Sequence, residues 1–162
     1  MRDKKVVFLV QAAAIAAVYV VLTVVFAAFS FGEVQVRLSE ALTILPYFTP
    51  AAVPGLFIGC LVANIAGGAI LPDILFGSLA TLIGAVGSYL LRKKKFLVPL
   101  PPIIANTLIV PFILRYGYGV NLPIALMMLT VGIGEVISCG VLGTLLLLAL
   151  KPYQKTVFQM ES

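Results

Sequence analysis

Histidine is absent from this sequence of 162 residues, and cysteine occurs only twice, as Cys60 and Cys139. Both cysteines lie inside apolar stretches, which is not the pattern of a disulfide framework. Two cysteines without a histidine also supply too few ligands for a structural zinc site. We therefore predict that the protein has no metal site and no cofactor.

Two sequence motifs of catalysis are also missing. The chain has no GxxxxGK[ST] phosphate loop, so it carries no recognisable ATP-hydrolysing machinery of that kind. It has no Gly-x-Ser-x-Gly nucleophile elbow. We predict that the protein is not an enzyme. A membrane enzyme or an assembly factor stays open as an alternative to a binding or transport protein, and analysis of reaction products would test it.

Charged residues are scarce, at 10% of the chain, whereas 62% of the residues are hydrophobic. Soluble domains carry roughly a quarter charged residues. A soluble chain of this composition would expose apolar patches large enough to aggregate. Lipid is the solvent that removes this difficulty, and transmembrane helices tolerate the many glycines and prolines. We predict an all-α integral membrane protein.

Six apolar segments predict six transmembrane helices in one domain over residues 1–162. The first segment is longer than a signal-peptide core of about 7–15 residues, so we expect a retained span. The second is too short to cross in a straight line, and the second and third could instead form a re-entrant hairpin. The segments are Val6–Ala28, Leu38–Phe48, Ala51–Ala66, Pro72–Leu91, Phe96–Tyr116 and Pro123–Leu150.

The formal net charge of +5 comes from basic residues whose distribution indicates membrane topology rather than a nucleic-acid partner. With six crossings and a cytoplasmic N-terminus, only Arg37 and Arg115 of the 11 basic residues lie outside. Cytoplasmic loops of membrane proteins carry the excess of lysine and arginine. We therefore expect both termini on the cytoplasmic side of the plasma membrane.

Acidic and amide side chains within the apolar segments are the candidates for a binding site. Glu135 lies near the midplane, where a carboxylate facing lipid costs about 3 kcal/mol or more, so it must face the interior. The loop 29–37 combines aromatic residues, a glycine and polar groups, and we expect it to close as a lid. The candidate binding residues are Glu135, Glu40, Arg37, Asn64, Asn106, Gln35 and Glu33.

Each candidate also has a purely structural interpretation. Arg37 and Glu40 are three residues apart and could pair with each other. Asp73 follows a proline at a helix start, where a carboxylate stabilises the helix dipole. Asn64 and Asn106 could form interhelical hydrogen bonds. Five tyrosines near the interfaces are interpreted as belt residues: Tyr47, Tyr89, Tyr116, Tyr118 and Tyr153.

Small residues recur every fourth position on two helices. The first helix carries two alanine pairs, Ala12 with Ala16 and Ala13 with Ala17, and the third carries a ladder that includes Gly55 and Gly59. Such faces permit close approach of another helix. The partner helix could belong to the same bundle or to another subunit, and the pattern alone does not distinguish them.

Four runs of the sequence resemble the QueT family. They are RLSEALTILPYF at 37–48, PGLFIGCLVAN at 54–64, DILFGSLATLIG at 73–84 and GEVISCGVLG at 134–143. The resemblance covers nearly the whole chain. Members of this family are substrate-binding S components of energy-coupling factor (ECF) transporters of prokaryotes, and they are assigned to queuosine precursors.

The resemblance implies an extracellular site for a deazaguanine base such as preQ1, preQ0 or queuine. It also implies two kinds of partner, a transmembrane coupling subunit (T component) and two cytoplasmic ATPases. Family members contact the coupling subunit through an Ala-x-x-x-Ala pattern on the first helix. The matching positions are Ala12/Ala16 or Ala13/Ala17.

A different class of transporter is the main alternative. A stand-alone small transporter of a purine-like base or another vitamin, driven by proton exchange at Glu135, would work without ATPases. The halves of the chain show no inverted repeat, the common sign of secondary transporters. Uptake with and without a coupling module would separate the two classes.

Overall fold

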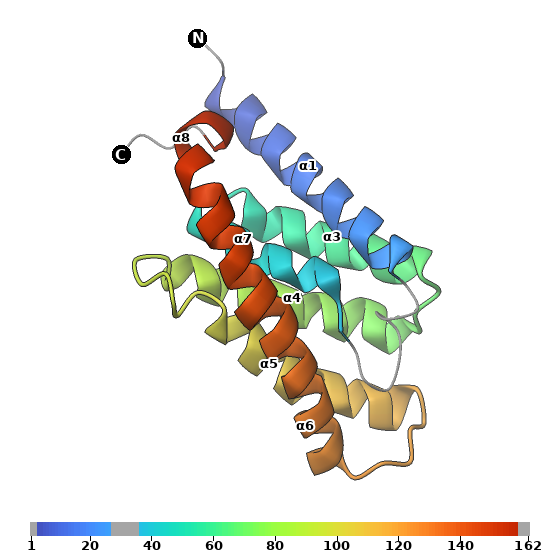
Figure 1. Cartoon of the computed structure of the whole chain (residues 1–162). Helices are drawn as coiled ribbons and strands as arrows, with labels where there is room; N and C mark the ends of the chain where they lie inside the picture. Colours follow the sequence, from blue (N-terminus) through green and yellow to red (C-terminus); the bar gives the residue numbers. More distant parts are fainter. Residues whose placement is uncertain (1–2, 27–35, 159–162) are drawn as a thin grey trace.

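A computed structural model describes residues 3–26 and 36–158 of the chain. All regular secondary structure within these two ranges is helical, as the composition predicts, and the helices lie side by side in a bundle (Figure 1). Four helical stretches in the described ranges are long and apolar enough to cross a membrane, namely 4–25, 73–90, 100–117 and 124–157.

The first helix, α1, runs from Lys4 to Val25. The carboxylate of Asp3 caps it by accepting a hydrogen bond of 3.0 Å from the backbone N–H of Lys5. Much of its surface is exposed apolar side chain, which suits contact with lipid. The predicted span at Val6–Ala28 is therefore confirmed as a helix, and its last residues lie outside the described ranges.

The second predicted segment is a helix of unusual type. Residues Leu38–Tyr47 form η1, a 3-10 helix of 10 residues with Pro46 inside it. Runs of 3-10 helix longer than three or four residues are uncommon and often mark functional positions. Its rise of about 2.0 Å per residue gives roughly 20 Å, against about 15 Å for the same residues in an α-helix. This segment therefore reaches further through the bundle than its residue count suggests.

The remaining helices follow the predicted order. α3 covers Ala52–Ala66 and is apolar but shorter than a full span. Two helices then begin or end in π-helical turns, which are frequent at functional sites. The elements are η2 (Asp73–Gly77) continuing into α4 (Ser78–Leu90), and α5 (Leu100–Phe112) continuing into η3 (Ile113–Gly117).

The C-terminal helix is one long path built from several pieces. A π-helical segment interrupts it directly after Glu135, and the path extends seven residues beyond the predicted end at Leu150. The pieces are α6 (Ile124–Glu135), η4 (Val136–Leu142), α7 (Gly143–Leu150), η5 (Lys151–Tyr153) and α8 (Gln154–Val157). Six helical segments are thus present as predicted, and within residues 3–26 and 36–158 four of them have the length of a full span.

α1 and α3 lie side by side in the bundle (Figure 1), and small residues form their contact. A Cβ atom added to Gly55 would lie 2.7 Å from the carbonyl oxygen of Ala12. One added to Gly59 would lie 3.0 Å from the Cα of Ala16 and 2.9 Å from the Cβ of Tyr19. Glycine at these two positions therefore brings Tyr19 into the interior of the bundle.

The start of α1 and the end of the C-terminal path meet at one end of the bundle. The side-chain amide nitrogen of Gln11 donates to the carbonyl oxygen of Phe158 at 3.4 Å, and the Gln11 oxygen accepts from Thr49 at 2.8 Å. The rings of Phe48 and Phe158 stack with their centroids 4.9 Å apart. The two ends of the described chain therefore lie close together at this end of the bundle (Figure 1).

Candidate functional site

Glu40 is the centre of a buried polar cluster. The start of η1 places its side chain in the bundle interior, where only 1% of the residue is exposed. Its Oε1 accepts hydrogen bonds from the hydroxyls of Tyr19 and, at 3.4 Å, Thr81. Its Oε2 accepts from the amide nitrogen of Asn106 at 3.4 Å. Donors from α1, α4 and α5 therefore converge on one carboxylate.

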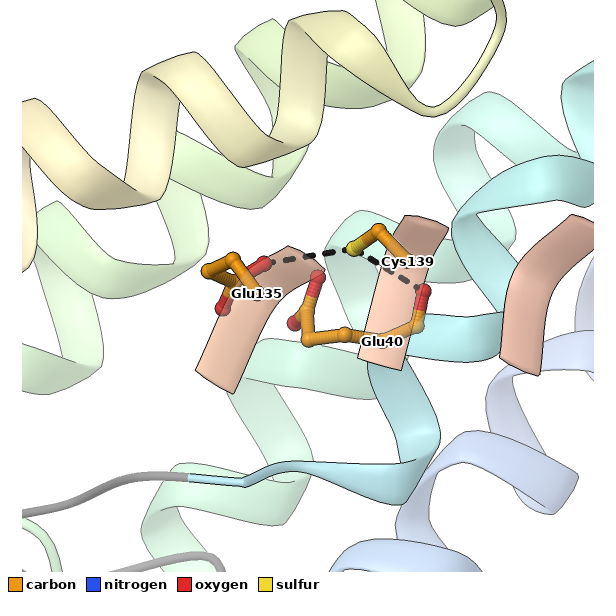
Figure 2. Close-up of side chains that lie close together, drawn as sticks. All are labelled: Glu40, Glu135 and Cys139. Carbon is orange, nitrogen blue, oxygen red and sulfur yellow. Dashed lines mark hydrogen bonds between the residues drawn. The ribbon is translucent and has the colours of Figure 1, made fainter. Parts of the chain in front are cut away.

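Glu135 faces the same cluster from the C-terminal helix (Figure 2). Its Oε2 accepts a hydrogen bond of 3.2 Å from the thiol of Cys139. The same thiol also lies 3.4 Å from the backbone carbonyl oxygen of Glu40. The π-helical turn that begins after Glu135 carries Cys139 onto the same side. The prediction that Glu135 points inward rather than toward lipid therefore agrees with its 5% exposure.

A second buried cluster lies where the connections between helices meet. The Nη2 of Arg37 is 3.6 Å from the Oδ2 of Asp73, and its Nη1 donates to the side-chain oxygen of Asn64 at 3.4 Å. Asn64 in turn donates to the backbone carbonyl of Asp73 at 3.2 Å. All three side chains are buried. The segment before η1, the end of α3 and the start of η2 are thereby held together.

Tyr118, just after η3, extends this cluster by donating its hydroxyl to the Oδ2 of Asp73 at 2.9 Å. Burial, followed by the nearby Asp73 carboxylate, raises the pKa of the Tyr118 phenol to about 12. The phenol therefore stays protonated at neutral pH and remains a donor. Although predicted as an interface residue, Tyr118 has this additional bond to a buried carboxylate.

Thr81 and Cys60 connect the two clusters. The hydroxyl of Thr81 lies 3.4 Å from both Glu40 Oε1 and the sulfur of Cys60. The amide nitrogen of Asn64 approaches the same sulfur at 3.7 Å. Polar side chains thus form a continuous path from Arg37 to Glu135 through an otherwise apolar bundle.

The arrangement could bind a metal cation, although no metal site was predicted. Oxygen atoms of Glu40 and Glu135 and the sulfur of Cys139 all lie within 4.8 Å of one another (Figure 2). The expectation of no metal site came from the small number of cysteines and the absence of histidine, and it left out a combination of Cys139 with carboxylates. The same atoms are equally suited to hydrogen-bond an organic cation or a pair of N–H donors.

The structure brings five of the seven predicted binding residues into these clusters. Glu40, Glu135 and Asn106 meet in the first, whereas Arg37 and Asn64 meet in the second. Glu33 and Gln35 lie outside the described residues, as does most of the predicted lid at 29–37.

Two pairings differ from the sequence interpretation. Arg37, the residue before η1, forms an ion pair with Asp73, a partner that the sequence interpretation did not name. Asp73, assigned only to a helix dipole, therefore belongs to the polar path and was missed as a site residue. The signal was its presence as one of only six acidic residues in the chain. Tyr19 is also a site residue that the sequence does not indicate, because its contact with Glu40 depends on tertiary packing.

The two alanine pairs of α1 have different surroundings. Ala12 is buried and Ala16 is partly buried against α3, whereas Ala13 and Ala17 are exposed on the outer face. The pair Ala12/Ala16 therefore serves packing within the bundle. Only Ala13/Ala17 offers a smooth surface to another protein.

Grooves on the outside of the bundle are apolar and separate from the polar clusters. One of about 430 Å³ lies between η2 and the stretch formed by the end of α5 and η3, and is lined by Phe76, Phe112 and Tyr116 among others. Another of about 320 Å³ lies between α1 and the C-terminal helix, lined by Val18, Leu42 and Leu146 among others. The grooves offer almost no polar group that could select a ligand, so the polar clusters are the candidate functional site.

Comparison with known proteins finds one curated relative and one matching family model. The Queuosine precursor transporter QueT of Lactococcus lactis subsp. cremoris (strain MG1363) is 33% identical over 85 residues, which cover 51% of this chain and 50% of that protein. The match thus spans about half the length of the curated relative. No solved structure gives a significant match. The family model described as QueT transporter matches residues 9–152, so this multi-pass membrane protein belongs to the QueT transporter family.

Proposed function

We propose that this chain is the substrate-binding S component of an ECF-type importer, and that it binds a queuosine precursor. Membership of the QueT transporter family and the name of the Lactococcus relative support this proposal. The observation that carries it is Glu40, a buried carboxylate surrounded by donors from three other helices. A transmembrane helix rarely keeps such a group unless it serves function.

The chemistry of the polar path suits a deazaguanine base. The guanine-like edge of such a base presents adjacent N–H donors beside a carbonyl acceptor. A carboxylate accepts two such donors in one plane, and an amide such as that of Asn106 serves the carbonyl. Glu40 and Glu135 supply the carboxylates within one cluster. In this proposal the ligand displaces the hydrogen bonds that these residues make with each other and with their neighbours.

The outer face of α1 is the proposed docking surface for the T component. Ala13 and Ala17 are exposed there, which permits close approach of a partner helix. The two cytoplasmic ATPases would supply energy that this chain lacks the motif to supply. The complex would lie in the plasma membrane of a prokaryote, with both termini of this chain in the cytoplasm.

Binding measurements test the proposed ligand, and uptake measurements separately test the need for a coupling module. Purified protein is titrated against guanine and deazaguanine bases, and a deazaguanine is expected to bind far more tightly than guanine itself. Uptake is then measured in cells with and without the coupling module. Uptake that persists without the module would favour the alternative, a stand-alone proton-coupled transporter, for which the neighbouring carboxyl groups of Glu40 and Glu135 are the specific support.

A further inference from the structure

A further apolar groove lies on the outside of the bundle between α4 and α5, and it ends at a run of basic residues. Its volume is about 430 Å³. The lining runs from Ile83 to Leu91 on the α4 side and from Leu100 to Ile109 on the α5 side. Leu91 and Leu100 flank the loop 92–99 that joins the two helices (Figure 1). That loop begins with four consecutive cations, Arg92, Lys93, Lys94 and Lys95.

The length of this groove matches one leaflet of a lipid bilayer. At 1.5 Å per residue, residues 83–91 and 100–109 each rise about 12–14 Å. Half of the hydrocarbon core of a bilayer is about 15 Å. Gly87 lines the groove, and a Cβ atom added there would lie 2.5 Å from the Cβ of Pro101. The two helices therefore approach closely at this point, and an apolar channel remains on the outer side of their contact.

The basic loop is held in place at the end of the groove. The hydroxyl of Ser88 donates to the carbonyl oxygen of Val98 at 2.7 Å, and the side chain of Val98 is buried in the core. The guanidinium carbon of Arg92 lies 3.9 Å from the centroid of the Tyr89 ring, and its Nη1 donates to the carbonyl oxygen of Tyr89 at 3.1 Å. Because a guanidinium has five N–H donors, Arg92 can also bind a phosphate group.

The positive charge of this loop has no acidic partner within residues 3–26 and 36–158, where the ion pair of Arg37 with Asp73 is found instead. Lys93 and Lys94 are exposed, and the Nζ of Lys95 lies 4.7 Å from the centroid of the exposed Phe96 ring. Aromatic side chains beside cations are typical of the boundary between lipid and water. An anionic group at this end of the groove would therefore meet cations that no carboxylate of the described chain neutralises.

We propose that the groove between α4 and α5 binds one anionic phospholipid of the surrounding bilayer. One acyl chain lies along the apolar groove, and Arg92 and the lysines after it bind the phosphate of the headgroup. The distribution of basic residues predicts that this loop faces the cytoplasm, whose leaflet contains anionic lipids. The groove itself is apolar, so the loop selects the lipid by its negative charge. This inference goes beyond the proposed function and holds whichever base the chain binds.

Lipid titration of the purified full-length protein in detergent tests the site. The probes are phosphatidylglycerol, phosphatidylcholine with the same acyl chains, and glycerol phosphate, which carries the phosphate without the chains. Native mass spectrometry counts the lipids that stay bound, and thermal unfolding measures stabilisation. We expect one phosphatidylglycerol to stay bound and raise the Tm. Phosphatidylcholine should be retained about tenfold less, and glycerol phosphate should leave the Tm unchanged.

Two variants separate the headgroup contact from the chain contact. The triple variant Lys93→Gln, Lys94→Gln and Lys95→Gln should reduce retention of phosphatidylglycerol about tenfold or more, since each basic residue near an anionic surface contributes about fivefold in affinity. Ile104→Trp adds bulk to the lining of the groove without changing the charge, and it should also reduce retention. A loss in both variants is expected only if the loop and the groove bind the same molecule.

Each variant has a matched control. The triple variant Lys4→Gln, Lys5→Gln and Lys151→Gln removes as many exposed cations on the same predicted side of the membrane, outside the lining of this groove. Ile133→Trp repeats the second substitution on α6, where 52% of the residue is exposed, against 49% for Ile104. Both controls should retain phosphatidylglycerol like the unaltered protein. If a groove or loop variant does not fold, the comparison of lipids on the unaltered protein decides.

Several results would overturn the proposal. Equal retention of the two phospholipids would reject selection by charge. Equal losses in the two triple lysine variants would show that the lipid responds to total charge rather than to this loop, and normal retention by Ile104→Trp would remove the acyl chain from the groove. If the loop variant keeps its lipid but no longer co-purifies with the coupling module, the loop binds a protein instead. Titration with a deazaguanine is a separate measurement, so each of these results leaves the proposed function standing.

Discussion

Arg37 and Asp73 form a buried ion pair, with Nη2 and Oδ2 3.6 Å apart, that joins the segment before η1 to the start of η2. Removal of one partner from a buried ion pair is strongly destabilising, because the other charge then stays buried without compensation. Asn64 and Tyr118 hydrogen-bond to the same pair, so four separate parts of the chain meet there.

Removal of one charge from this pair should destabilise the protein strongly. Asp73→Asn leaves the Arg37 guanidinium buried beside an uncharged amide, and we expect a loss of about 3–5 kcal/mol in the free energy of unfolding. The double variant Arg37→Gln with Asp73→Asn should recover part of this loss, because neither charge is then left alone. Thermal unfolding in detergent measures both. The single variant Arg37→Gln is measured as well. If the loss of stability in the double variant equals the sum of the two single losses, the two residues are not coupled.

Tyr118 should contribute a single hydrogen bond to the same cluster. Tyr118→Phe removes the donor to Asp73 and should lower stability by about 1.5–3 kcal/mol, as for a hydrogen bond to a charged group. Its pKa of about 12 predicts that the bond remains below about pH 10 and is lost as the phenol ionises. Tyr116→Phe is the control, because Tyr116 lies nearby with 77% of its surface exposed. Equal effects of the two substitutions at neutral pH would contradict this role.

The two alanine pairs of α1 should respond differently to enlargement. Ala13→Leu with Ala17→Leu adds bulk to the exposed face, so folding and ligand binding should persist while assembly with the T component and uptake are lost. Ala12→Leu with Ala16→Leu should instead disrupt the contact with Gly55 and Gly59 and prevent stable folding. Expression, ligand titration and co-purification with the coupling module separate these results. Normal uptake by the Ala13/Ala17 variant would place the docking surface elsewhere.

Most of the architecture could be predicted because lipid restricts the backbone to few structures. Long apolar segments must form helices there, since each buried N–H and C=O needs a partner within the segment. The 3-10 geometry of η1 was not predicted, because the apolar pattern of residues 38–47 does not show how far the backbone is stretched. The π-helical turn after Glu135 leaves no sequence signature either.

The site was predicted only in part, for a similar reason. The high cost of a charge in lipid identified Glu135 as an interior group from the sequence, and Glu40 was a candidate binding residue beside it. Tyr19, Thr81 and Cys139 could not be assigned to Glu40, because those contacts depend on how α1, α4 and the C-terminal helix rotate against η1. Local spacing also suggested only Glu40 as a partner for Arg37, since a neighbour three residues away is visible in the sequence and the ion pair with Asp73 is not.

Substitution of either glutamate should weaken ligand binding more than substitution of a neutral polar residue in the same cluster. Glu40→Gln and Glu135→Gln preserve size but replace one acceptor oxygen with an NH₂ donor, which opposes the N–H groups of a guanine-like edge. Each should lose about 1.5–3 kcal/mol of binding free energy, or more than tenfold in affinity. Glu40→Gln should also lower stability, since the amide nitrogen would face donors from Tyr19, Thr81 or Asn106.

Asn106 is the internal comparison for this measurement. Asn106→Ala removes a neutral group and should cause a smaller loss of affinity than either glutamate substitution, because hydrogen bonds between neutral groups are weaker than charge-assisted ones. Titration calorimetry on folded protein, verified by thermal unfolding without ligand, gives the three affinities. If both glutamine variants bind a deazaguanine as tightly as the unaltered protein, neither carboxylate contacts the base. Glu40 would then act only to hold α1, α4 and α5 around η1, and the binding site would have to lie nearer Arg37 and Asn64.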